Sequence, residues 1–281
     1  MTISNNIYNK ILNIAKTNDN VRVVEMNGSR VNPNIEPDQY QDFDIVFYVA
    51  DYDAFLRDES WMKDLGDVIL SQTTLDQRES DNLENNSFIY MLQFRDGSRL
   101  DLSIVDVKKI NEDFKQDTLS KILLDKDGYN LHDRQDESDY YVKKMTRKEF
   151  HYCTNEFFWV TPYVAKGIAR GHLFYALKHL DIIRQELENI IDWWIGDIHN
   201  YQIAVGKGKS RYVKLLPKEL FNQYESTYAS VNGDRIWVAL FNTLDLFDQL
   251  ASELAKTYAY PYEYRKKDEV VDFIKEHYQK Q

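Results

Sequence analysis

The sequence predicts an α+β fold, with a mixed sheet and its helices in the first half and an α-helical bundle in the second. Three observations support this prediction. Short β-branched and aromatic runs fill residues 21–105, long stretches with helical periodicity follow residue 147, and a polar stretch at 125–139 separates them. A chain of 281 residues is long enough for two domains, which we place at 1–140 and 141–281.

The first half opens with a helix and a strand. Apolar residues recur at helical spacing over 3–14, and the β-branched run 21–24 predicts a strand that leads into a turn at Asn27-Gly28-Ser29. The polar segment 31–41 carries two prolines and is expected to be a loop. The run 43–49 is nearly continuous in β-forming residues, so we expect it to be a central strand.

Further strands follow in the first half. Apolar residues over 52–65 predict one helix, and the run 68–70 predicts a strand. The runs 87–94 and 100–105 flank Asp96-Gly97, which indicates two antiparallel strands joined by a tight turn. After residue 106 the pattern is helical and we expect no further strand.

The second half is expected to be helical throughout. Residues 148–170, 172–194 and 236–258 carry apolar residues at helical spacing. Pro162 predicts a kink in the first of these helices, and Gly171 predicts a break after it.

Composition and charge exclude several classes of protein. The formal net charge of -11 repels phosphate backbones and would attract a small cationic substrate, so we expect no nucleic-acid partner. No apolar run approaches the length of a membrane span, so no membrane partner is expected. The single cysteine, Cys153, excludes an intramolecular disulfide, and with no secretory signal at the start we expect a cytoplasmic protein.

Three aspartates form the candidate catalytic and metal site. Asp42 and Asp44 are two residues apart at the start of the central strand, so their side chains point to one face of the sheet. Asp101 lies between Leu100 and Leu102, where alternation turns it away from its apolar neighbours. If the two strands are neighbours, the three carboxylates converge and hold two Mg²⁺ ions, an arrangement typical of phosphoryl and nucleotidyl transfer.

A candidate nucleotide-binding turn precedes these aspartates. Gly28-Ser29 offers backbone N–H groups and a hydroxyl to phosphates, and Arg30 adds a charge-assisted hydrogen bond. The ordered set of this turn, the Asp42-Phe43-Asp44 motif and Leu100-Asp101-Leu102 resembles the nucleotidyltransferase fold shared with DNA polymerase beta.

Longer segments resemble one family in particular. Asn27-Gly28-Ser29-Arg30, the segment 41–45, Leu123-Leu124-Asp125-Lys126-Asp127, Cys153-Thr154-Asn155-Glu156-Phe157 and Tyr163-Val164-Ala165-Lys166-Gly167 look like the aminoglycoside 6-adenylyltransferases. These segments span most of the chain in the same order. The resemblance implies a two-domain enzyme that transfers AMP from ATP to a hydroxyl of streptomycin, with Mg²⁺.

The helical half contributes three further candidates. Glu156 is the candidate for binding the cationic antibiotic or for removing a proton. Lys166 and Arg170 lie one helical turn apart, where they would meet the triphosphate or pyrophosphate. Alternatively, Glu156 is a glutamate on the helix surface with no role in binding, and Lys166 and Arg170 form a basic stripe that faces solvent.

Other functions remain open at this point. The aspartate pair could cap a turn and face solvent, and Asp101 could serve as a metal ligand, as the base, or as both. Transfer of a nucleotide to a protein or tRNA is one alternative to an aminoglycoside acceptor. A catalytically silent nucleotide-binding protein is another, although such proteins tend to lose a metal carboxylate.

Overall fold

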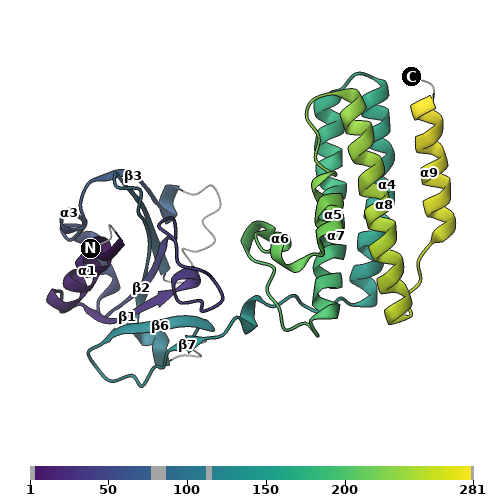
Figure 1. The fold of residues 1–281 in the computed structure, drawn as a ribbon. Coiled ribbons are helices and arrows are strands. Elements are labelled where there is room, and N and C mark those ends of the chain that lie inside the picture. Colours follow the sequence, from purple (N-terminus) through teal and green to yellow (C-terminus); the bar gives the residue numbers. More distant parts are fainter. Residues whose placement is uncertain (1–3, 77–86, 112–115, 280–281) are drawn as a thin grey trace. The chain divides into compact units, whose positions relative to one another are not determined.

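In the computed structural model, residues 4–76, 87–111 and 116–279 are described, and the chain divides into two compact units, 1–139 and 140–281 (Figure 1). The first unit is built on a mixed sheet and the second on long helices. The predicted α+β class is confirmed.

The sheet of the first unit has seven strands in the order β3-β4-β5-β2-β1-β6-β7. The central strands β2 and β5 run parallel, and the other neighbouring pairs are antiparallel. The strands are β1 (Val21–Asn27), β2 (Phe43–Val49), β3 (Val68–Thr73), β4 (Ser87–Phe94), β5 (Arg99–Asp106), β6 (Leu119–Asp125) and β7 (Arg134–Gln135).

One face of this sheet carries the core. Alternate residues of β2 and β5, such as Phe43 and Leu100, are buried together with apolar residues of helices α1 (Ser4–Thr17), α2 (Tyr52–Arg57) and α3 (Met62–Leu65). The opposite face carries a smaller buried cluster of Val23, Tyr48 and Val107. The side chains between the core residues of β2 and β5 therefore point away from the main core.

Two expectations for the first unit are wrong. Residues 52–65 form two short helices, because Asp58 is extended and its carboxylate accepts a hydrogen bond from the Ser60 amide. Residues 119–125 form strand β6, although the helical pattern was expected to continue from residue 106. That segment has one β-branched residue, Ile122, so propensity is weak and the strand depends on pairing with the edge of β1.

The second unit contains the predicted long helices and three more. These are α4 (Arg147–Ala169), α5 (Leu173–Ile198), α6 (Tyr212–Leu215), α7 (Lys218–Glu225), α8 (Gly233–Tyr258) and α9 (Tyr264–Gln279). A capping box of Thr146 and Glu149 starts α4, which continues through Pro162. The predicted break at Gly171 is confirmed, since this glycine has a φ of +69° between α4 and α5. Among the described helices, none combines the length and apolarity needed to cross a membrane.

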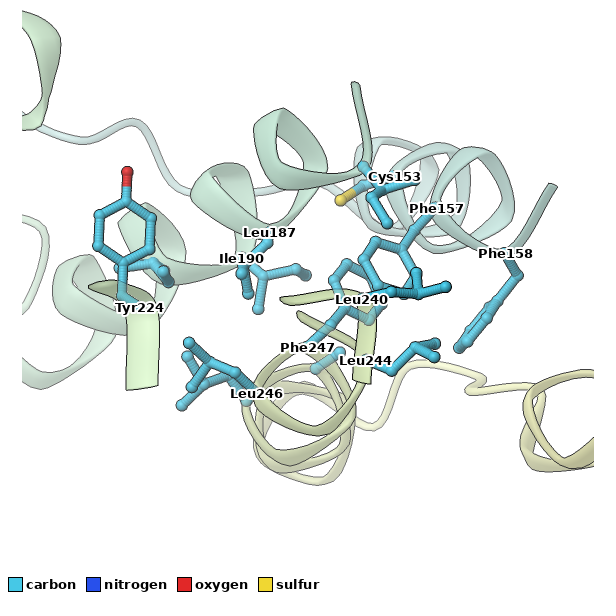
Figure 2. Close-up of a cluster of buried hydrophobic side chains, with 14 of the residues drawn as sticks. Cys153, Phe157, Phe158, Leu187, Ile190, Tyr224, Leu240, Leu244, Leu246 and Phe247 are labelled. Carbon is cyan, nitrogen blue, oxygen red and sulfur yellow. The ribbon is translucent and has the colours of Figure 1, made fainter. Parts of the chain in front are cut away.

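Aromatic packing joins α4 and α8 in the core of the second unit. Figure 2 shows Phe157 of α4 against Phe247 of α8, and their ring centroids lie 3.5 Å apart with an interplanar angle of 7°. Phe158 packs edge-on against Phe247, and Cys153 is buried in the same cluster as a packing residue. This contact fixes α4, which carries the predicted site residues Glu156 and Lys166 and has Arg170 as its C-cap.

Tyrosine hydroxyls in this unit pair with carboxylates on the helices. Because a buried hydroxyl needs a hydrogen-bond partner, each pair satisfies a tyrosine that would otherwise be costly to bury. The pairs are Tyr212–Asp192, Tyr224–Glu188, Tyr258–Asp197 and Tyr262–Asp248. Burial is the main cause that raises the pKa of each of these tyrosines.

The stacked pair of phenylalanines provides a test of this packing. We expect Phe247→Ala to lower the free energy of unfolding by about 3 to 5 kcal/mol, because it leaves a cavity against Phe157. Phe174→Ala removes the same side chain where it is 78% exposed, and a change below about 0.5 kcal/mol is expected. Urea denaturation followed by circular dichroism measures both values, and equal losses would contradict the assignment of this core.

Candidate active site

Asp44 and Asp101 lie side by side on the face of the sheet that points away from the main core. They are register partners in the parallel strands β2 and β5. Their neighbours Phe43 and Leu100 point the other way and are 2% and 0% exposed. Because directly opposed residues in neighbouring strands share a face, the two carboxylates converge.

Asp42 and Arg99 complete a cluster around these aspartates. Asp42 precedes β2, and its carboxylate Oδ2 lies 3.8 Å from the Nε of Arg99. The same guanidinium donates to both oxygens of Asp101, from Nε at 2.9 Å and from Nη2 at 2.8 Å. The hydrogen bond to Asp101 is the main cause that raises the pKa of Arg99, and Asp42 and Asp44 add to it through their charges.

The Gly28 turn packs directly against Asp44. Strand β1 ends at Asn27, the register partner of Asp44, and residues 28–30 continue as one turn of 3-10 helix. Gly28 has a φ of +76°, and a Cβ built there would lie 2.3 Å from Oδ2 of Asp44. A glycine is therefore required both by the backbone conformation and by the close approach of the carboxylate.

Arg30 holds the segment that carries Asp42. Its Nε donates to the Asp42 carbonyl at 2.9 Å and its Nη2 donates to the Gln41 carbonyl at 2.6 Å. The guanidinium lies over the Phe43 ring, 3.7 Å from its centroid. Burial lowers the pKa of Arg30, while the charges of Asp38, Asp42 and Asp44 oppose this shift. Two of its nitrogens are thus committed to the protein backbone.

A buried carboxyl supports the cluster from strand β1. Glu25 is 2% exposed and accepts a hydrogen bond from the Tyr48 hydroxyl at 2.7 Å. The side-chain amide of Asn27, in the orientation that satisfies its hydrogen bonds, donates to the Glu25 carboxylate at 3.1 Å. Burial raises the pKa of Glu25, and hydrogen bonds from Tyr48 and Ser120 partly offset this effect. This network fixes the strand directly beside the aspartates.

The donor set of the cluster suits a hard divalent cation, although the side chains do not form a ready metal site. In the parts of the chain that the structure describes, no three His, Cys, Asp or Glu side chains are arranged to hold a metal ion. Three carboxylates on one face are nevertheless the oxygen ligands that Mg²⁺ prefers. The Arg99 guanidinium already places positive charge between Asp42 and Asp101, so the cluster accommodates a cation.

The remaining predicted residues lie on α4 of the second unit. Glu156 is half-buried, and Lys166 and Arg170 are exposed. The Lys166 ammonium lies 5.7 Å from the centroid of the Tyr163 ring and 5.9 Å from that of Phe273. Arg170 is the C-cap residue of the helix. The structure thus brings together the three aspartates and the Gly28 turn within the first unit, and it places these three residues on one helix of the second.

Several residues beside the predicted ones in each unit were not singled out from the sequence. Arg99 lies two residues before Asp101 in a strand, so the period of two that places Asp101 also places Arg99 on its face. Tyr152 and Trp159 flank Glu156 at helical spacing and are 65% and 66% exposed. Glu25 was missed because the predicted strand ended at residue 24.

Comparisons with known proteins show which family the chain resembles. Residues 1–277 match the sequence model of the streptomycin adenylyltransferase family. The chain is 35% identical to the aminoglycoside 6-adenylyltransferase of Campylobacter jejuni over 91% of its length and 89% of that protein. It is 33% identical to that of Staphylococcus aureus, over 99% and 100%. The crystal structure of an aminoglycoside 6-adenyltransferase from Bacillus subtilis aligns with a TM-score of 0.48 at 25% identity, covering 99% of both chains.

The contact between Gly28 and Asp44 generates a prediction. A left-handed backbone strains any L-residue by about 1 to 2 kcal/mol, and crowding adds about 1 to 3 kcal/mol. We expect Gly28→Ala to lower the free energy of unfolding by the sum of these two amounts, because the substitution introduces both the strain and the crowding. Gly97→Ala is the matched control, because Gly97 has a φ of +89° and no atom within 4 Å of the added Cβ. Urea melts that find the two variants equally stable would contradict the close contact.

Proposed function

The chain belongs to the streptomycin adenylyltransferase family and is a nucleotidyltransferase, and we propose that it transfers AMP from ATP to a hydroxyl group of an aminoglycoside, with streptomycin as the acceptor. The observation that carries this proposal is the register pair of Asp44 and Asp101 beside the Gly28 turn. Transfer of AMP would change the charge and size of a cationic antibiotic, and resistance is the proposed consequence. We place the protein in the cytoplasm, because the proposed reaction uses ATP.

The three carboxylates are the proposed ligands of two Mg²⁺ ions. Asp42 and Asp44 would contact both ions, and Asp101 would contact the one nearer the acceptor. When bound, these ions neutralise charge on the phosphates and lower the pKa of the acceptor hydroxyl. The closeness of Asp44 and Asp101 supports this assignment, because two carboxylates on one face repel each other unless positive charge lies between them.

The turn at residues 28–30 is the proposed triphosphate site. Backbone N–H groups of Gly28 and Ser29 and the Ser29 hydroxyl would donate to phosphate oxygens. Arg30 contributes positive charge beside this turn, while its hydrogen bonds to the Gln41 and Asp42 carbonyls hold Asp42 in place. Lys166 and Arg170 are proposed to bind phosphates from the second unit.

The reaction follows from these roles. The acceptor oxygen attacks the α-phosphorus in line, its bond to phosphorus forms as the bond to the β-phosphate oxygen breaks, and pyrophosphate leaves. The hydroxyl proton passes to a carboxylate, for which Asp101 and Glu156 are the candidates. Arg30 orients the main chain of Asp42, so it acts as a positioning residue.

The exposed face of α4 is the proposed aminoglycoside site. Tyr152, Glu156 and Trp159 lie four and three residues apart and share one side of the helix. A carboxylate pairs with a cationic group of the substrate, and aromatic rings attract cations and pack on apolar faces. The net charge of -11 adds a long-range attraction for a polycation.

A direct assay tests the activity and the carboxylates together. With ATP, Mg²⁺ and streptomycin, we expect one pyrophosphate for each drug molecule that gains AMP, and EDTA is expected to stop the reaction. Asp44→Asn should lower kcat by at least about 100-fold, because it removes charge stabilisation from the transition state. Asp53→Asn, an exposed aspartate on α2, should leave kcat within about twofold. Labelled AMP found on tRNA or protein, and not on any aminoglycoside, would overturn the acceptor assignment.

The α4 face is tested separately by Glu156→Gln. We expect the KM for streptomycin to rise about tenfold, equivalent to about 1.4 kcal/mol, with the KM for ATP unchanged. Glu253→Gln makes the same change at an exposed position of α8 and should alter neither constant. Steady-state kinetics with each substrate varied in turn measures these values, and an equal rise in the KM for ATP would contradict a role in acceptor binding.

A further inference from the structure

Arg99 occupies a position that the proposed reaction does not explain. It is the first residue of β5, two residues before Asp101, so both side chains lie on the face of the sheet that carries the aspartates. The strand follows a tight turn at residues 95–98, and the Arg99 side chain is 41% exposed. The guanidinium is therefore anchored at one end of a strand and accessible to solvent.

The contacts of Arg99 engage the oxygens that a metal site would use. Its Nε and Nη2 donate to the two oxygens of Asp101 at 2.9 and 2.8 Å, which is the planar fork of a bidentate pair. Its Nε also lies 3.8 Å from the carboxylate of Asp42. One guanidinium thus contacts two of the three aspartates, and its single positive charge offsets half of their combined charge.

Arg99 and a divalent cation are in competition for this cluster. A carboxylate oxygen has a second lone pair, so geometry alone does not prevent it from accepting from Arg99 and binding a metal ion. Charge does oppose this arrangement, because two cations that share Asp42 and Asp101 repel each other across a short distance. When both cations are present, the carboxylates bind one of them, the guanidinium or the metal ion, less strongly.

The triphosphate changes this balance. A guanidinium fork binds phosphate as well as it binds carboxylate, and a triphosphate brings several negative charges beside the cluster. The phosphates of a nucleotide can therefore accept hydrogen bonds from the Arg99 guanidinium when a metal ion binds the carboxylates. Metal and nucleotide then favour each other's binding through one side chain that moves between two partners.

We propose that Arg99 is a resident counter-ion that makes divalent-cation binding at Asp42 and Asp101 conditional on the triphosphate. This inference rests on the proposed function, since it assumes that the same carboxylates bind the metal ions. It assigns to Arg99 a positioning role that goes beyond the transfer reaction. The enzyme binds a metal ion weakly alone and strongly together with ATP.

Metal binding measured without turnover tests this proposal. Mn²⁺ is titrated into the full chain and free Mn²⁺ is followed by electron paramagnetic resonance, with and without a non-hydrolysable ATP analogue. We expect Arg99→Gln to bind Mn²⁺ alone about fivefold more tightly, equivalent to about 1 kcal/mol, because the carboxylates lose their competing cation. The factor by which the analogue tightens Mn²⁺ binding should fall by a similar amount.

A matched control variant is available on the other side of the same tight turn. Arg95 also forms an ion pair, with Asp67, and its side chain is 72% exposed. Arg95→Gln should leave both Mn²⁺ affinities unchanged. Arg99→Lys keeps the charge without the fork, so an intermediate Mn²⁺ affinity is expected. In EDTA, Arg99→Gln should lower the melting temperature by about 2 to 4 °C, and Mg²⁺ should restore it.

The outcomes separate this inference from the proposed function. If Asp44→Asn does not weaken Mn²⁺ binding, the carboxylate cluster is not the metal site and the proposed function fails with it. If Asp44→Asn weakens Mn²⁺ binding but Arg99→Gln leaves both the affinity and the effect of the analogue unchanged, only the counter-ion role is overturned. The counter-ion role would also be overturned if Arg99→Gln, without the ATP analogue, bound Mn²⁺ more weakly than the unmodified protein does.

Discussion

Repulsion among carboxylates gathered on one face of a sheet is the constraint on which the site depends. Asp44 and Asp101 are held together by strand register, which depends in turn on the core residues that alternate with them. The backbone therefore fixes the two charges, and a cation must offset them. Arg99 supplies one such charge from the protein itself, and a divalent ion is the proposed second. The Gly28 turn lies directly against the Asp44 carboxylate.

The second unit carries the proposed acceptor site. Its buried core of apolar and aromatic residues holds α4 in place, while one side of that helix carries exposed aromatic rings beside the half-buried Glu156. Tyr152 and Trp159 lie exposed at helical spacing on this side. A cationic sugar is a suitable partner, because it offers both apolar ring faces and charge. The proposed division of labour places phosphate chemistry on a sheet and acceptor recognition on a helix.

Periodicity in the sequence was sufficient to predict the geometry of the aspartates but not their electrostatic partners. Alternation within 43–49 and 100–105 places Asp44 and Asp101 opposite the core, and only the pairing of their strands had to be assumed. Strand β6 escaped prediction because its sequence has weak β-propensity and pairing with β1 determines its structure. The contacts of Arg30 and Arg99 depend on the directions of their side chains. Spacing in the sequence does not tell whether such a side chain contacts a neighbouring residue or points into solvent.

Asp42, Asp44 and Asp101 are proposed to bind together the metal ions that accompany the nucleotide. The most direct measurement is anomalous diffraction from crystals grown with Mn²⁺ and a non-hydrolysable ATP analogue. We expect manganese peaks at about 2.1 Å from oxygens of all three aspartates, with the analogue beside the Gly28 turn. Peaks that contact the triphosphate alone, with Arg99 still paired to Asp101, would contradict it.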